Sequence, residues 1–198
     1  ACTPFYLHKT RMQSVFNELR KTWLLFQVSK FVGSHGNVRR FREFVTTRRM
    51  WRRALKSNVL NAIVIAHCLN FGDEGTHMLV ELLRDVDIEH LTLLNCNVGD
   101  SGAVALAQVL RSSKRIKVLQ LSTNNIGDEG ATALAELLKT NTTFKALHLT
   151  DNHSITSVGL EAVVESLKKN TSTPDLTVQL SNDYFHRHGA KAADELLN

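Results

Sequence analysis

A spaced pattern of apolar residues recurs along the second part of the chain. It has the form L-x-x-L-x-L-x-x-N, and in its clearest copy Leu119 and Leu121 are followed by Asn124. Side chains alternate between the two faces of a strand, so the alternation at Leu119 and Leu121 predicts a short strand with one buried face. The four clear copies begin at Leu60, Ile88, Ile116 and Phe144.

A second apolar pattern, with helical spacing, follows each predicted strand. After the third strand it consists of Ala131, Leu134, Leu137 and Leu138. Intervals of three and four residues place these side chains on one face of a helix, which we expect to pack inward. Each unit is therefore predicted to be a strand, a turn and a helix.

Glycines mark the same repeat independently. Gly127-Asp-Glu-Gly-Ala has an upstream counterpart in Gly99-Asp-Ser-Gly-Ala. Successive aligned glycines are 27, 28, 29 and 30 residues apart, and units of about 28 residues are typical of a solenoid. We predict about five units over residues 58–198. The aligned glycines are Gly75, Gly102, Gly130, Gly159 and Gly189.

Polar side chains punctuate the units. A short acceptor side chain recurs just before each predicted helix, where it could cap free backbone amides of that helix. Asn124 ends its strand, where a side-chain amide can satisfy buried backbone groups of the turn. Cys68 and Cys96 take that place in the first two units, and we expect them to be small core residues. The expected helix caps are Asp73, Asp100, Asp128 and Ser157.

These units resemble the ribonuclease-inhibitor class of leucine-rich repeats, in which Asn or Cys ends the strand. The resemblance covers about residues 58–198. It implies an α/β leucine-rich-repeat solenoid with a curved parallel sheet inside and helices outside. The fifth strand, around Leu176, Val178 and Leu180, fits the pattern only loosely.

The outward positions of the predicted strands form a concave face that is nearly uncharged. Solenoids commonly bind their partners through such a surface. Polar, uncharged side chains there suggest a modest contact with protein and no small-molecule substrate. The residues that we expect to contact a protein partner are Val64, His90, Thr92, Gln120, His148 and Gln179.

Charge is distributed unevenly along the chain. Residues 1–57 hold 13 Lys and Arg against 2 Glu, so their net charge is 13 − 2 = +11. The whole chain has a net charge of +5, which leaves +5 − 11 = −6 for residues 58–198. We therefore predict a basic, helical N-terminal arm or cap at residues 1–57, joined to an acidic repeat region at residues 58–198.

The second half of the arm predicts an amphipathic helix. Phe41, Phe44 and Trp51 share one arc of this helix, and we expect them to cover the first repeat. A cationic stripe on another arc would attract phosphate backbones, and acidic protein or anionic lipid would suit the same charge. The expected anion-binding residues are Arg39, Arg42, Arg49, Arg52, Arg53 and Lys56.

Motifs for catalysis, metals or cofactors are absent from the sequence. His186 and His188 form a close pair without a Cys or carboxylate at ligand spacing, and no glycine-rich loop precedes Lys-Ser or Lys-Thr. We expect a non-enzymatic protein with no metal and no cofactor. Apolar runs fall short of the roughly 20 residues of a membrane span. Three cysteines without disulfide spacing indicate an intracellular protein, and the Arg-rich leader resembles mitochondrial targeting segments, so the compartment is mitochondrial or cytoplasmic.

Two main functional hypotheses follow. In the first, the chain is a scaffold or accessory subunit of a large intracellular assembly. Its repeats bind protein subunits and its arm anchors to structural RNA or another anionic surface, with an organellar ribosome or other ribonucleoprotein as the leading candidate. The alternative is a regulatory protein-interaction module of a cytoskeletal, ciliary or immune-sensor complex. A third hypothesis, a GTPase-activating protein of nuclear transport, has no functional residues that map onto this sequence.

Overall fold

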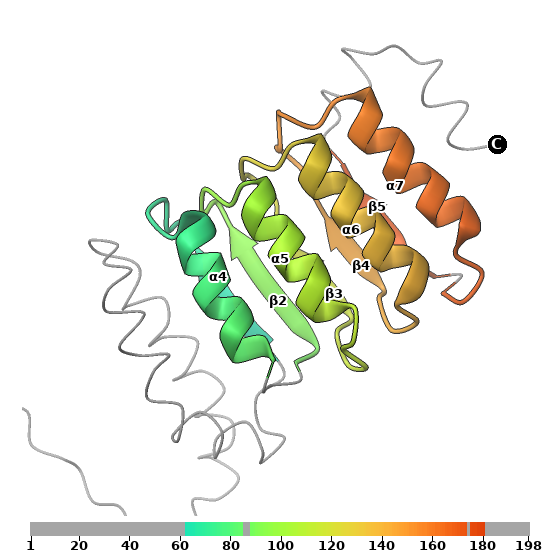
Figure 1. The fold of residues 1–198 in the computed structure, drawn as a ribbon, viewed down its shortest axis with the longest axis horizontal. Coiled ribbons are helices and arrows are strands. Elements are labelled where there is room, and N and C mark those ends of the chain that lie inside the picture. The colour runs from blue at the N-terminus through green and yellow to red at the C-terminus, as the bar shows by residue number, and fades with distance from the viewer. Residues whose placement is uncertain (1–61, 85–87, 174, 181–198) are drawn as a thin grey trace, which may run out of the picture.

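The computed structural model describes residues 62–84, 88–173 and 175–180 (Figure 1). Strands and helices alternate along this part of the chain, as the repeat predicts. The strands are β1 (Ala62–Ala66), β2 (His90–Leu94), β3 (Val118–Gln120), β4 (Ala146–His148) and β5 (Thr177–Gln179). The helices are α4 (Gly72–Leu83), α5 (Asp100–Leu110), α6 (Asp128–Thr140) and α7 (Ser157–Lys169).

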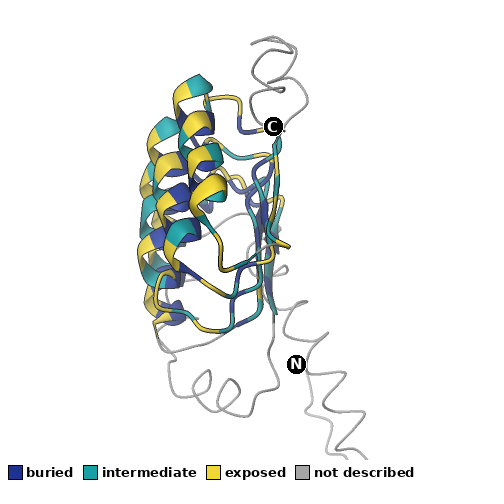
Figure 2. Cartoon of the chain, turned by 90° about the vertical axis from the view of Figure 1, so that its right-hand side faces the viewer, coloured by how far each residue is buried: buried dark blue, intermediate teal, exposed yellow. Residues whose placement is uncertain are grey.

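The five strands form one parallel sheet in sequence order, each paired with the next. The four helices stand side by side in the same order, and all of them cover one face of the sheet (Figures 1 and 2). A strand can join a parallel neighbour only through a crossover connection, which each helix provides here. This arrangement confirms the predicted α/β repeat solenoid.

The core lies between the sheet and the helices. In the third unit Leu119 and Leu121 are fully buried, as are Leu134 and Leu138 on the facing side of α6. Because every unit fills the same positions, two continuous rows of buried side chains run across the sheet. These rows are Ile63, Leu91, Leu119 and Leu147, and Ile65, Leu93, Leu121 and Leu149.

Asn124 satisfies the turn backbone as the sequence predicts, and it does so across two repeats. Its Oδ1 accepts hydrogen bonds from the backbone N–H groups of Cys96 at 2.9 Å and Val98 at 3.1 Å. Its Nδ2 donates to the carbonyl oxygens of Leu93 at 2.7 Å and Leu121 at 2.9 Å. Buried backbone groups need such partners, so this side chain joins two neighbouring turns.

The prediction that the short acceptor side chains cap their own helices is wrong. Asp100 is already the first residue of α5, whose N-cap is Gly99, and it does not cap that helix. Its Oδ1 instead accepts from the N–H groups of Gly127 at 2.7 Å and Gly130 at 2.8 Å, at the start of α6 in the next repeat. The carboxylate therefore stabilises the positive end of the following helix.

The same displacement occurs at the other aspartates. Asp73 accepts from the N–H of Gly99 at 2.7 Å, and Asp128 accepts from the N–H of Thr156 at 2.7 Å. Ser157 is likewise the first residue of α7, and the side chain that caps α7 is that of Thr156, which accepts from the N–H of Val158. Asp100, Asp128 and Ser157 lie one residue beyond the N-cap position, and Asp73 lies two residues beyond it, which is too far into the helix to act as a cap.

The periodic glycines follow from these carboxylates. A Cβ added at Gly130 would lie 2.7 Å from Oδ1 of Asp100 and 2.8 Å from Cγ2 of Ile126. Carbon atoms do not approach so closely without displacement, and Gly102 and Gly159 meet the preceding aspartate in the same way. Glycine recurs because the backbone must lie next to the carboxylate of the preceding repeat.

Several predictions fall outside the described residues. They comprise the basic arm with its cationic stripe, the domain boundary at residues 57 and 58, the pair His186 and His188, and the fifth helical segment around Gly189. The structure therefore does not test them.

Candidate interaction surfaces

The residues predicted to bind a partner alternate with core residues along the strands, so they lie on the face of the sheet opposite the helices (Figure 2). We name it the open face, because no described helix covers it. Strand register places Val64, Thr92, Gln120, His148 and Gln179 side by side, one from each strand. A parallel row contains Ala62, His90, Val118, Ala146 and Thr177. The predicted residues are thus brought together, and their binding role stays a prediction.

The open face is exposed or half-exposed and carries no Lys, Arg, Asp or Glu in the two rows. Its character changes across the sheet. The β1 side is apolar, with Val64 beside small alanines, and the β5 side is polar, with His148 and Gln179. A partner would therefore find apolar contact area at one end and hydrogen-bonding groups at the other.

Hydrogen bonds fix the polar half of the open face. Nδ1 of His148 lies 2.6 Å from Oε1 of Gln179. Since that oxygen can only accept, Nδ1 donates, and Nε2 is left to face a partner. Ser122 donates to Oε1 of Gln120 at 2.7 Å and lies 2.8 Å from Oγ1 of Thr150. These side chains are held in place before any partner arrives.

A second row of polar side chains follows the turns beyond the strands, and the sequence did not reveal it. His67, Asn95, Thr123 and Asp151 occupy equivalent positions in four units, and all have positive φ angles. Thr123, with a φ of 56°, is the least suited to this conformation because it is β-branched. Nδ2 of Asn95 lies 3.2 Å from Nδ1 of His67, which links two of these turns.

The two cysteines at strand ends are buried, as predicted for core residues. Cys68 is 2 % exposed and Cys96 is fully buried. Burial raises the pKa of both thiols, that of Cys96 to about 12. Both thiols are therefore protonated and poorly nucleophilic, which fits a structural role.

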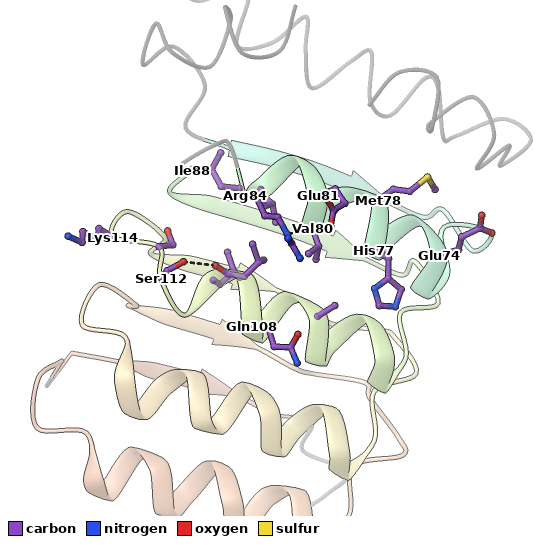
Figure 3. A pocket seen from close by; sticks show the side chains of 15 residues that line it. Glu74, His77, Met78, Val80, Glu81, Arg84, Ile88, Gln108, Ser112 and Lys114 are labelled. Atoms are coloured by element: carbon purple, nitrogen blue, oxygen red, sulfur yellow. Dashed lines mark hydrogen bonds and ion pairs between the residues drawn. The ribbon is translucent and has the colours of Figure 1, made fainter. Parts of the chain in front are cut away.

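A groove of about 1010 Å³ runs between α4 and α5 on the helical side (Figure 3). His77 and Glu81 project from α4, and Gln108 lies opposite on α5. Nε2 of His77 is 3.0 Å from Oγ of Ser101, and Glu81 forms an ion pair with Arg84 at 3.4 Å. The lining of this groove mixes acidic, basic and apolar groups, so it does not favour one class of ligand. We assign the groove no function.

Cations in the described repeats are confined to one edge of the sheet, where carboxylates such as Glu89 and Glu136 accompany them. We name the edge where strands start and helices end the strand-start edge. All described Lys and Arg lie there, in the last helical turns and the loops that lead into strands. At the opposite edge the described charged side chains are carboxylates, such as Glu74, Glu129 and Asp151. The acidic repeat region is therefore strongly polarised.

Neither a metal site nor a membrane helix is found in the described residues. No group of three or more His, Cys, Asp or Glu is arranged there to hold a metal ion. Among the same residues, no helix has the length and apolar character to cross a bilayer.

Comparison with known proteins gives the family and the fold. A family model described as Leucine Rich repeat matches residues 87–107, 113–135 and 140–164. No curated protein sequence matches the chain. These matches identify the repeat type without confirming the ribonuclease-inhibitor subclass.

Two solved structures share the fold. One is titled leiomodin-1 actin-binding site 2, with a TM-score of 0.61 and 21 % identity over 75 % of this chain and 86 % of that one. The other is the tropomodulin C-terminal domain of Caenorhabditis elegans, with a TM-score of 0.56 and 18 % identity over 75 % and 92 %. Repeat pattern, fold and family match agree, and this chain is a leucine-rich-repeat protein.

Proposed function

We propose that the repeats form a non-enzymatic protein-interaction module of a cytoskeletal complex, and that actin is its partner. The observation that carries the proposal is the open face, a continuous surface built in register from five strands with no charged side chain in its two rows. Solenoids use such extended surfaces to bind protein. The alternative hypothesis of the sequence analysis is thus preferred to a ribonucleoprotein.

The composition of the open face supports a protein over a nucleic acid. Nucleic-acid affinity comes mainly from Lys and Arg that neutralise phosphates, and the open face has neither. Val64 and Val118 offer apolar area, and Gln120 and His148 offer hydrogen-bonding groups beside it. Charged residues are depleted at the centre of protein interfaces, which agrees with this uncharged composition.

The size of the open face suits one secondary-structure element of a partner. Neighbouring strands lie about 4.8 Å apart, so the distance from β1 to β5 is roughly 19 Å. A helix rises about 1.5 Å per residue, so about 13 residues would cross the sheet. Because the polar side chains are already hydrogen-bonded, little conformational entropy is lost on binding.

The choice of actin rests on the shared fold. The leiomodin-1 structure, an actin-binding site, shares the fold of this chain over most of its length. At 21 % identity the likeness establishes the fold, and the partner is our proposal.

Binding of purified monomeric actin tests this proposal. The open-face variant Thr92→Arg/Gln120→Arg places two bulky charges on the surface, and we expect its dissociation constant for actin to rise about tenfold or more. The control Gln108→Arg/Thr132→Arg adds the same charge on exposed helix positions and should change it by less than about twofold. If wild-type protein does not bind actin, the partner is wrong; if both variants bind like wild type, the open face is wrong.

A further inference from the structure

A group of five cations with one described carboxylate partner lies on the strand-start edge of the second to fourth repeats. One carboxylate, Glu89, pairs with it: Nζ of Lys117 is 2.8 Å from Oε2, and a terminal nitrogen of Arg115 is 3.2 Å from Oε1. Five cations and one carboxylate give a net charge of 5 − 1 = +4. We name as the cationic cluster Arg111, Lys114, Arg115, Lys117 and Lys145.

The backbone stacks members of the cationic cluster directly on one another. The N–H of Lys145 donates to the carbonyl of Lys117 at 2.7 Å, and the N–H of Lys117 donates to the carbonyl of Glu89 at 2.7 Å. Lys117 therefore has a carboxylate on one side and Lys145 on the other. Lys145 is exposed and forms no ion pair with Asp175, the described carboxylate of the next loop. Like charges at neighbouring strand positions are destabilising.

Helix electrostatics account for Arg111, the C-cap residue of α5, but not for the three lysines of the cluster. Cations in the last turn of a helix are favourable because they face its negative end, and Lys139 and Lys169 have that position. Lys114, Lys117 and Lys145 lie in loops outside the helices. Asp85 and Asp87 lie outside the described residues, and in the sequence Lys145 belongs to a loop two repeats further along. An anionic partner would relieve the repulsion at Lys145.

The surroundings of the cationic cluster indicate which anion it receives. Lys117 and Lys145 directly precede Val118 and Ala146, so the cluster borders the open face. Single-stranded nucleic acid is held by bases that stack on exposed aromatic rings. Among the described residues the only Phe, Tyr or Trp rings are those of Phe71 and Phe144, and both are buried. An acidic polypeptide needs no stacking surface.

We propose that the cationic cluster docks an acidic segment of the protein that occupies the open face, and thereby sets the direction in which this partner crosses the sheet. The inference rests on the proposed interaction function. The apolar part of the partner lies on the open face, and its acidic end lies over Lys117 and Lys145. Charges at the border of an interface mainly accelerate association and select orientation.

A labelled peptide of twelve glutamates, titrated against the full chain by fluorescence anisotropy, tests the proposal. All proteins carry Arg42→Gln, Arg49→Gln and Arg53→Gln, so that the N-terminal arm does not mask the cluster. The test variant neutralises Arg111, Lys114 and Lys145, which form no ion pair among the described residues. The control neutralises Arg84, Lys139 and Lys169. Each of these forms an ion pair with a glutamate three or four residues earlier in the chain.

The test variant, Arg111→Gln/Lys114→Gln/Lys145→Gln, should weaken peptide binding about tenfold at low salt, and the control with the same net charge by less than about threefold. Equal losses in the two variants would overturn the proposal. So would a 16-base-pair RNA duplex that binds more tightly than the peptide and depends on the same three residues. If the test variant binds actin like wild type while the open-face variant does not bind it, this inference is wrong and the proposed function stands. Peptide binding without actin binding would remove only the choice of actin.

Discussion

At the scale of single residues, the repeats are joined by a carboxylate and a glycine that meet across each boundary. Asp100 binds the N–H groups of Gly127 and Gly130, and the missing side chain of Gly130 makes room for it. The carboxylate takes the place of a helix cap at the start of α6. Loss of such a cap typically costs about 1 kcal/mol of stability.

Gly130→Ala tests this contact. Helix propensity alone would make this variant more stable, whereas the contact predicts that it is less stable. Alanine is favoured over glycine inside a helix by about 1 kcal/mol. The new Cβ would press on Asp100, Ile126 and Ala103, and overpacking typically costs about 1 to 3 kcal/mol. We expect a lower free energy of unfolding in urea denaturation. The loss should shrink in an Asp100→Ala background, and a stabilised Gly130→Ala protein would refute the contact.

At the scale of elements, the turns that follow β3 and β4 each contain one side-chain amide that binds the backbone of two repeats. Asn152 repeats the role of Asn124: its Nδ2 donates to the carbonyls of Leu121 and Leu149, and its Oδ1 accepts from the N–H of Ile126. Each asparagine therefore fastens its own strand to the preceding repeat. One asparagine therefore stabilises both the turn of its own repeat and the turn of the preceding repeat.

Replacing Asn124 should be far more damaging than replacing the asparagine beside it. Asn124→Ala leaves the N–H groups of Cys96 and Val98 without their side-chain acceptor, and each unpaired buried group costs about 1 to 3 kcal/mol. Asn125→Ala removes an exposed side chain and should cost less than about 0.5 kcal/mol. Equilibrium unfolding of both variants measures the difference. Equal stabilities would show that the amide does not hold the turn.

The contrast between Leu119 and Asp100 shows what the sequence could predict. Leu119 is buried because of its own spacing within one strand, so a local pattern was sufficient. The predicted rows of the open face followed from the same spacing, once the units were aligned. Asp100 was assigned to its own helix, whereas its partners lie 27 and 30 residues later. The separation of charge likewise emerges only when loops from successive units stack at one edge.

At the scale of the whole molecule, the repeats combine an uncharged face with two oppositely charged edges. The acidic edge is partly used for structure, since Asp73, Asp100 and Asp128 each bind backbone of the following repeat. In the cluster, Arg111, Lys114 and Lys145 form no ion pair among the described residues. This asymmetry supports a partner that lies on the open face and contacts the strand-start edge.

Stability should fall in acid through Asp128, whose pKa is lowered in the folded protein. Burial raises the pKa of Asp128, but hydrogen bonds from Thr156 and Gly159 outweigh burial and hold its pKa below the ordinary value. A depressed folded-state pKa stabilises the protein above the unfolded pKa of about 3.9, and the stabilisation is lost as pH falls through the folded pKa. Asp128→Asn should be less stable than wild type at pH 7 in urea denaturation. The difference should narrow below about pH 4, and a constant difference would contradict this assignment.

The most direct test of the central claim is a photo-crosslink from the open face to the partner. A benzophenone amino acid placed at Gln120 lies in the middle of the exposed row, and one placed at Thr132 lies on the exposed side of α6. With purified actin, irradiation should yield a covalent adduct from position 120 and none from position 132. An adduct from position 132 alone, or equal adducts from both, would contradict binding through the open face.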